Sequence, residues 1–203
     1  MIRFSDVSFS YSGSEKKALS HINLAVAPGE FVGIIGGSGA GKTTLLRGAN
    51  GTIPHMLHGD FYGSVTVLGE DTFSVSPVAL SKTVGTVSDD IDAQAVTSVV
   101  EDEILFGLES FGVPKEEIPS RVDGALSQIG ILDLKTREIS SLSGGQKQKV
   151  AIAAILALKP KILLLDEPTG ELDPKSSKAV YETLRALNRD FNITVVVVEQ
   201  KIM

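Results

Sequence analysis

The sequence predicts an α/β fold: a parallel sheet with helices, a small antiparallel edge sheet and an inserted helical subdomain. Two apolar runs, 162–165 and 193–198, are typical of parallel strands that are buried on both faces. A glycine-rich segment, 36–43, separates an apolar strand from a helix, and residues from 88 to about 158 show mostly helical periodicity. Strands that alternate with helices in this way place ligands at the carboxyl edge of the sheet.

Size and composition exclude several classes of function. The 203 residues fit a single domain, and the absence of cysteine excludes disulfides, thiolate catalysis and sulfur-ligated metals. The net charge of −6 provides no broad basic surface, so we expect no nucleic-acid partner. The longest apolar run, 150–158, is far shorter than the ~20 residues of a membrane span. Any membrane association is therefore expected to be peripheral, through a protein partner.

The N-terminal residues predict two antiparallel strands. Residues 2–11 and 18–26 alternate apolar and polar side chains, and a polar turn, 12–17, separates them. Tyr11 lies just before this turn. An aromatic ring at this position either stacks on a purine base or is an ordinary strand tyrosine, and position alone does not decide between the two.

The segment 36–43 follows the strand 30–35 and fits the pattern G-x-x-x-x-G-K-[ST]. Its successive backbone N–H groups form a nest for phosphate oxygens, and the helix that follows adds unpaired donors and a partial positive charge. The pattern predicts a RecA-like P-loop NTPase core that binds a nucleoside triphosphate. The expected ATP-binding residues are those of this segment and the next residue: Gly36, Gly37, Ser38, Gly39, Ala40, Gly41, Lys42, Thr43 and Thr44.

Further elements follow in order. Residues 51–55 break the helix, 63–69 predict a strand bounded by glycines, and 84–87 predict a short strand. A helix is expected from about Lys175 to Arg189 before the last strand. We therefore expect a single nucleotide-binding domain over 1–203.

The helical subdomain is expected at about 89–154, with the core formed by 1–88 and 155–203. Its clearest helix covers 118–129, and Pro114 and Pro119 are placed to begin helices.

Two acids end the strand 162–165. Asp166 beside the phosphate loop is expected to hold Mg²⁺ directly or through water, and Thr43 to supply a hydroxyl ligand. Glu167 is placed to orient or deprotonate an attacking water.

The segment 142–146, LSGGQ, predicts a capping box in which Ser143 caps a helix and Gln146 reaches back. A cap alone leaves the paired glycines, Gly144 and Gly145, unexplained. They allow a ligand to approach the backbone at a positively polarised helix end, which indicates a second anion site.

LSGGQ, together with GGSGAGKT and ILLLDEP, resembles the ATP-binding-cassette (ABC) ATPases, and the similarity covers essentially 2–203. In that family two cassettes face each other head to tail, with each ATP between the phosphate loop of one and the LSGGQ helix of the other. The resemblance implies that Tyr11 stacks on the base, Lys42 contacts the β- and γ-phosphates, Asp166 serves Mg²⁺ and Glu167 is the catalytic base.

The resemblance also implies an interface with the partner cassette. Ser143 and Gly145 would contact the partner's γ-phosphate as part of the signature 143–146. The segment 170–173 resembles the D-loop, so Leu172 and Asp173 would lie at the interface.

Two positions depart from the family pattern. Ser88-Asp89 stands where the family carries Phe-Gln, although Gln94 follows, and Asp89 could still bind Mg²⁺. Glu199-Gln200 stands in place of the switch histidine; Gln200 can donate a hydrogen bond but cannot take up a proton as imidazole can. We therefore expect the chain's own site to bind ATP but to hydrolyse it slowly, while its intact signature serves a partner's site.

The segments 51–55 and 99–107 resemble energy-coupling-factor importers of vitamins and transition metals, some of which carry two cassettes on one polypeptide. The expected partners are a second cassette, in a heterodimer, tandem or homodimer, and an integral-membrane transport subunit at the cytoplasmic face of the membrane. Because relatives continue beyond the position of Gln200, a longer protein is expected. The alternatives are a soluble ABC ATPase of translation or DNA repair, and a degenerate ATP-binding regulatory cassette.

Overall fold

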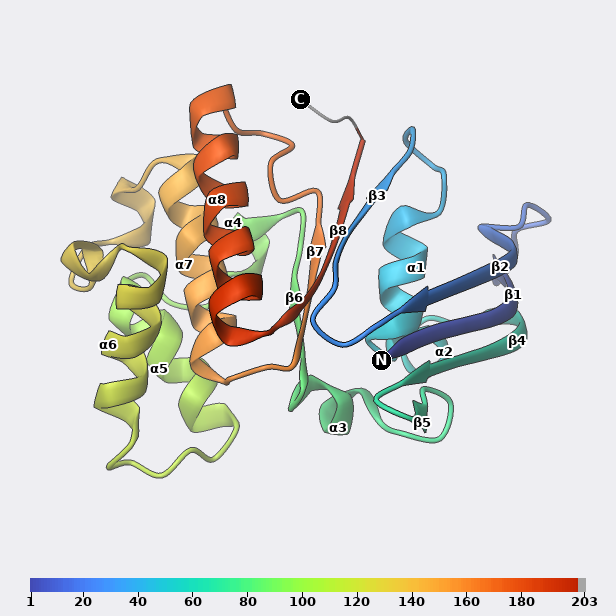
Figure 1. The fold of residues 1–203 in the computed structure, drawn as a ribbon, viewed down its shortest axis with the longest axis horizontal. Helices are drawn as coiled ribbons and strands as arrows, with labels where there is room; N and C mark the ends of the chain where they lie inside the picture. The colour runs from blue at the N-terminus through green and yellow to red at the C-terminus, as the bar shows by residue number, and fades with distance from the viewer. Residues whose placement is uncertain (201–203) are drawn as a thin grey trace.

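The computed structural model describes residues 1–200 and contains two four-stranded sheets (Figure 1). The antiparallel sheet has the strand order β2-β1-β4-β5, and the parallel sheet has the order β3-β8-β7-β6. The fold is therefore α/β with a parallel sheet and a small antiparallel sheet, as the sequence predicts. The strands are β1 (Ile2–Tyr11), β2 (Leu19–Val26), β3 (Phe31–Ile35), β4 (Gly59–Val67), β5 (Glu70–Asp71), β6 (Val84–Val87), β7 (Ile162–Asp166) and β8 (Thr194–Glu199).

Helices cover both faces of the parallel sheet. Helix α1 lies between the two sheets, whereas α4 to α8 gather on the opposite side of the parallel sheet (Figure 1). Two 3-10 turns, at Leu132–Leu134 and Ile139–Ser141, precede α7. The α-helices are α1 (Lys42–Ala49), α2 (Thr52–His55), α3 (Pro77–Ser81), α4 (Ile91–Gln94), α5 (Val100–Ser110), α6 (Ile118–Ile129), α7 (Gly144–Ala157) and α8 (Pro174–Phe191).

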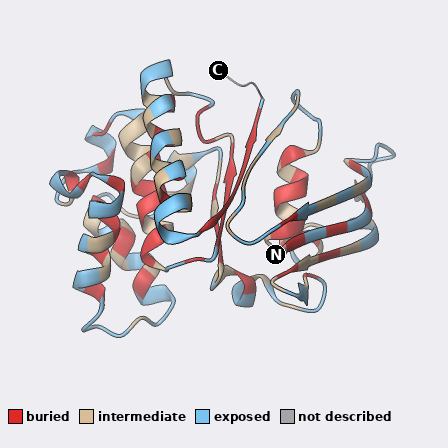
Figure 2. Cartoon of the chain, in the orientation of Figure 1, coloured by how far each residue is buried: buried red, intermediate tan, exposed pale blue. Residues whose placement is uncertain are grey.

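Strand β7 is buried on both faces, which explains its uninterrupted apolar sequence. Leu163 and Leu165 pack into a cluster with α5 to α8, while Ile162 and Leu164 pack into a second cluster with α1 and the antiparallel sheet. Strand β8 alternates in the same way, and both strands are buried throughout (Figure 2). Because the first cluster joins helices of 91–157 to β7 and α8, the division into core and helical subdomain stays a prediction.

Strand β4 begins at Gly59, four residues before the expected start, so the expectation that Gly63 bounds this strand is wrong. Gly63 lies inside the strand with φ +87°, and a Cβ there would lie 2.5 Å from the carbonyl oxygens of Ser5 and Asp6. Glycine is needed at this position because the neighbouring strand β1 bulges toward it. The sequence around Gly63 looks the same whether the glycine ends a strand or lies inside one, so the sequence alone could not place the start of β4.

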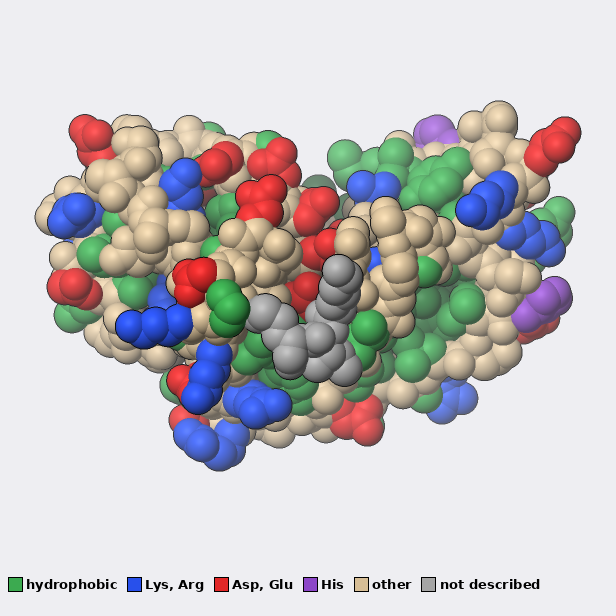
Figure 3. Space-filling view, turned by 90° about the horizontal axis from the view of Figure 1, so that it is seen from above, with side chains coloured by type: hydrophobic (Ala, Val, Ile, Leu, Met, Phe, Trp, Pro, Cys, Tyr) green, Lys and Arg blue, Asp and Glu red, His purple; other side chains and the backbone are tan. Residues whose placement is uncertain are grey.

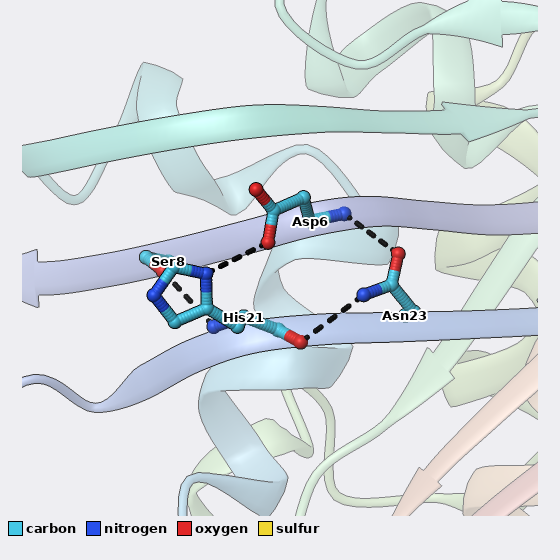
Figure 4. Close-up of polar contacts among 4 residues, drawn as sticks. All are labelled: Asp6, Ser8, His21 and Asn23. Atoms are coloured by element: carbon cyan, nitrogen blue, oxygen red, sulfur yellow. Dashed lines mark hydrogen bonds and ion pairs between the residues drawn. The ribbon is translucent and has the colours of Figure 1, made fainter.

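The bulge in β1 is satisfied by polar side chains (Figure 4). The Asp6 N–H donates to Asn23 Oδ1 at 3.0 Å, and the His21 N–H donates to Ser8 Oγ at 3.0 Å. Both Asp6 and His21 have positive φ, and their side chains lie 2.8 Å apart. These bonds replace ladder hydrogen bonds that the register shift interrupts.

Two connections differ in detail from the sequence-based prediction. Residues 51–55 end α1 as expected, but they also form the one-turn helix α2. Pro119 lies in the first turn of α6 as expected, whereas Pro114 precedes a turn and begins no helix. A proline fixes φ near the helical value, which is equally suited to a turn.

Candidate nucleotide-binding site

The phosphate loop, residues 36–41, connects β3 to α1 at the carboxyl edge of the parallel sheet. Its first residue, Gly36, donates from its N–H to the carbonyl oxygen of Glu199 in β8 at 3.2 Å. Gly41 caps α1 with φ +90°, and a Cβ there would lie 2.3 Å from the carbonyl oxygen of Ala18. The glycine is therefore required for the loop to close onto the helix N-terminus, where backbone donors favour an anion.

Lys42 joins the phosphate loop to the acidic end of β7. Its side chain is only 6% exposed, and its ammonium donates to the carbonyl oxygen of Gly37 at 3.2 Å. The same Nζ atom lies 3.2 Å from Glu167 Oε1. Two groups that are about 120 residues apart in the sequence therefore meet, as the motif spacing predicts.

Asp166 has the features of a metal ligand. Burial is the main cause that raises the pKa of its carboxyl group; the neighbouring carboxylates of Asp89 and Glu167 raise it further, and the Thr43 hydroxyl lowers it. Its Oδ1 atom is buried and has no hydrogen-bond partner among the described residues. An orphan carboxylate oxygen beside a hydroxyl and two further carboxylates fits the oxygen ligands that Mg²⁺ prefers.

Glu167 is held in an unusual backbone conformation. Its φ is +43°, which costs about 1–2 kcal/mol for a residue with a Cβ. Its N–H donates to the carbonyl oxygen of Val198 at 2.9 Å, and its own carbonyl oxygen accepts from Gly170 at 3.1 Å. The turn after β7 is thus fastened to β8 and aims a side chain that is 24% exposed toward Lys42.

A cleft of about 860 Å³ is lined by residues from the two positions that depart from the family pattern and by a residue of the signature. Asp89, Glu167 and Gln200 line it with Gly144, and acidic side chains gather along the hollow between the two lobes (Figure 3). The phosphate loop itself does not line this cleft and is joined to it through the Lys42–Glu167 pair.

Gln94 does not reach the cleft with its polar group. Its Oε1 accepts from the Ser88 N–H at 2.8 Å, and its Nε2 donates to the carbonyl oxygen of Thr86 at 3.4 Å. Gln94 therefore holds the loop after β6 in place. From this loop it is the carboxylate of Asp89 that raises the pKa of Asp166 through its charge.

Tyr11 lies against α1. Its hydroxyl is 2.9 Å from Thr44 Oγ1 and accepts from Arg47 Nη1 at 3.4 Å. Its ring meets Phe9 edge to face, with ring centroids 4.9 Å apart. These contacts fix the ring next to the helix of the phosphate loop, and stacking on a base stays a prediction.

The signature 143–146 forms the predicted capping box. The Ser143 N–H donates to Gln146 Oε1 at 2.9 Å, and the Gln146 N–H donates to Ser143 Oγ at 3.4 Å. The paired glycines have a further role within the chain, because they pack against the segment that begins α8. A Cβ on Gly144 would lie 3.1 Å from Leu172 Cδ2, and one on Gly145 would lie 3.0 Å from Ser176 Cβ.

Asp173 caps α8 and so anchors the end of the predicted D-loop. Its Oδ1 accepts from the N–H groups of Lys175 at 2.9 Å and Ser176 at 3.1 Å. The hydrogen bond from the Ser176 hydroxyl is the main cause that lowers the pKa of Asp173.

We expect Asp173→Ala to lower the midpoint of thermal unfolding at neutral pH, because two helix donors lose their acceptor. The lowered pKa sets the pH dependence: the stabilisation is present above the unfolded-state pKa of about 3.9 and is lost as the pH falls through the lower folded-state value. The difference between the unfolding midpoints of the two chains should therefore narrow as the pH falls from 7 towards 3. A constant difference across this range would contradict the assignment.

The hydrogen bonds that surround the Glu199 side chain could not be predicted from any motif. Glu199 ends β8 and is only 7% exposed, and its Oε1 accepts hydrogen bonds from Thr169 and Tyr181. A charged residue at the end of an otherwise apolar strand is the single local signal.

The parallel sheet, the phosphate loop at a helix N-terminus and the acids at the end of β7 define a P-loop nucleoside-triphosphate-binding domain. The family model for ABC transporters matches residues 19–170. The chain belongs to the ABC transporter family, as one of its ATP-binding cassettes.

Individual relatives support this assignment. The chain is 42% identical over 199 residues to a Pyrococcus horikoshii protein provisionally named an ABC transporter ATP-binding protein, covering 98% of this chain and 70% of the relative. It is 42% identical over 202 residues to a similarly named Streptomyces avermitilis protein, covering 100% of this chain but 36% of the relative. The chain thus spans about a third of the length of some relatives.

Two solved structures are similar over nearly the whole chain. One is cbiO1 of Clostridium perfringens, part of the ABC transporter complex cbiONQ, with 32% identity, a TM-score of 0.89, and coverage of 98% of this chain and 78% of that one. The other is the dimeric bacterial ABC transporter cassette MJ0796, with 30% identity, a TM-score of 0.82, and coverage of 99% and 88%. A post-hydrolysis dimer of MJ0796 with ADP and phosphate also matches.

Proposed function

We propose that the chain is the ATP-hydrolysing motor subunit of a membrane importer, for a vitamin or a transition-metal ion. One observation carries the proposal: a phosphate loop paired with the acids of β7 and a complete signature lie on the same chain. The likeness to cbiO1, a part of the complex cbiONQ, supports an importer of the energy-coupling-factor type.

Each residue of the chain's own ATP site has a separate role in this proposal. Lys42 binds the β- and γ-phosphates over the N-terminus of α1, and Tyr11 holds the base. Glu167, whose Oε1 lies 3.2 Å from Lys42 Nζ, accepts a proton from the attacking water. Thr43, Asp166 and Asp89 would hold Mg²⁺, which supplies charge neutralisation at the phosphates when bound.

The signature acts on a second cassette. Ser143 and Gly145 contact the partner's γ-phosphate at the N-terminus of α7, and Leu172 and Asp173 cross the interface. The dimer of MJ0796 supports such a pair. ATP closes the pair because it binds the closed form better than the open one.

The membrane is reached through a transport subunit, with the cassette at the cytoplasmic face. Among the described residues, helices fall short of the length and apolar character needed to cross a bilayer. The substrate is selected by the membrane partner, and cbiO1 as part of the complex cbiONQ supports this arrangement.

The chain's own site is proposed to turn over slowly, because Gln200 lines the cleft where a proton-accepting histidine is expected. In a heterodimer or tandem whose partner site is disabled, we expect the remaining hydrolysis to be about 10²-fold below that of the intact pair. Gln200→His should raise this remaining rate, and the exposed Gln128→His on α6 serves as the matched control. Turnover at the full rate in the disabled pair would refute the proposal of a slow site.

Gln200 and Asp89 also favour a second candidate, an ATP-binding regulatory cassette without turnover. The same measurement separates the two, since a regulatory cassette binds ATP but leaves no hydrolysis when the partner site is disabled.

A further inference from the structure

Glu199 is a buried carboxylate that the proposed chemistry does not use. It is 7% exposed, and its Oε1 accepts from the Thr169 N–H at 3.2 Å, the Thr169 hydroxyl at 2.6 Å and the Tyr181 hydroxyl at 3.2 Å. Within residues 1–200 it forms no ion pair that would offset the cost of its burial. A buried carboxylate is stabilised when several hydrogen-bond donors satisfy it, and here three do.

Two of the three donors belong to the turn that carries Glu167, and the third, the Tyr181 hydroxyl, lies on α8. Thr169 lies two residues after Glu167, and Gly170 closes the turn by donating to the Glu167 carbonyl oxygen. The turn is therefore fastened to β8 twice: by the Glu167 N–H on the carbonyl oxygen of Val198, and by Thr169 on the side chain of Glu199.

Glu199 also contacts the phosphate loop. Its carbonyl oxygen accepts from the N–H of Gly36, the first residue of that loop, at 3.2 Å. One residue thus fixes both the loop that binds the phosphates and the turn that carries the carboxylate opposite Lys42.

Tyr181 remains a donor over the working pH range. Burial and the nearby Glu199 carboxylate raise the pKa of its hydroxyl to about 12. The Tyr181 hydroxyl at the contact between α8 and the end of β8 therefore keeps its proton near neutral pH.

We propose that Glu199 is a positioning residue for hydrolysis: its buried carboxylate holds the turn 167–170 so that Glu167 faces the phosphates. The inference rests on the proposed function, in which Glu167 is the general base. Because Glu167 has φ +43°, its backbone relaxes when the turn is released, and a displacement of about 1 Å costs about 10²-fold in rate. ATP binding depends on the phosphate loop and is largely retained.

The test uses the assembled cassette pair with the partner site disabled and follows hydrolysis of bound ATP in a single turnover. Glu199→Ala should lower this rate about 10²-fold with little change in the Kd for ATP. Glu199→Gln keeps the acceptor oxygen and should restore most of the rate. Glu30→Ala is the matched control: Glu30 also braces a turn, accepting from the Ala27 N–H at 2.7 Å, but in front of β3.

The outcomes separate the two proposals. If Glu167→Gln hydrolyses ATP as fast as the unsubstituted chain, the proposed function fails and the inference fails with it. If Glu167→Gln is inactive while Glu199→Ala keeps the full rate, or if Glu199→Gln loses as much as Glu199→Ala, the inference alone is overturned. Should Glu199→Ala fail to fold, Thr169→Val removes one bond without a cavity; a drop of about tenfold supports the proposal, and an unchanged rate overturns it.

Discussion

Replacing Lys42 with alanine should abolish tight ATP binding. The ammonium is almost fully buried at the mouth of the phosphate loop, 3.2 Å from the carbonyl oxygen of Gly37. Charged hydrogen bonds contribute about 1.5–3 kcal/mol each, so the loss of two phosphate contacts weakens binding by about 10²-fold or more. Titration calorimetry of the purified protein with ATP measures the change.

The control for this variant is Lys178→Ala on α8, where the lysine is 79% exposed and 3.9 Å from Glu182. It should bind ATP like the unsubstituted chain. Retained micromolar affinity in Lys42→Ala would contradict the placement of the phosphates. A binding loss shared by both variants would instead indicate a general effect of charge.

The strands and the phosphate loop could be predicted because their causes are local. An uninterrupted apolar run such as Ile162–Leu165 is needed for a strand that is buried on both faces. Lys42 and Glu167 could be expected to meet, because each follows a strand of one parallel sheet.

Other features depend on which distant segments meet. Glycine is needed at position 63 because the neighbouring strand β1 bulges toward it. The side chain of Gln94 turns toward the backbone at the end of β6 and away from the cleft. Glu199 and Thr169 are 30 residues apart and belong to no pattern with fixed spacing. The packing of Gly145 on Ser176 likewise could not be predicted, since it requires the placement of α8 against α7.

Gly145→Asp should affect the other site of the proposed cassette pair: it should lower hydrolysis at the partner's site and leave ATP binding at the chain's own phosphate loop unchanged. Gly145 lies in the first turn of α7, where an added carboxylate stabilises the helix through its dipole. In the proposed cassette pair the same carboxylate would face the partner's γ-phosphate and repel it. Loss of stabilisation for the developing charge lowers the rate about 10²–10³-fold.

Steric strain is the competing explanation for Gly145→Asp, because a Cβ there would lie 3.0 Å from Ser176 Cβ. Gly145→Ala introduces the same Cβ without charge, and Gly124→Asp introduces the same charge in α6, where a Cβ meets no atom within 4 Å. If repulsion is the cause, Gly145→Asp loses far more partner-site turnover than either control. An equal loss in Gly145→Ala would mean that the paired glycines serve the contact with α8 and not the partner's phosphate.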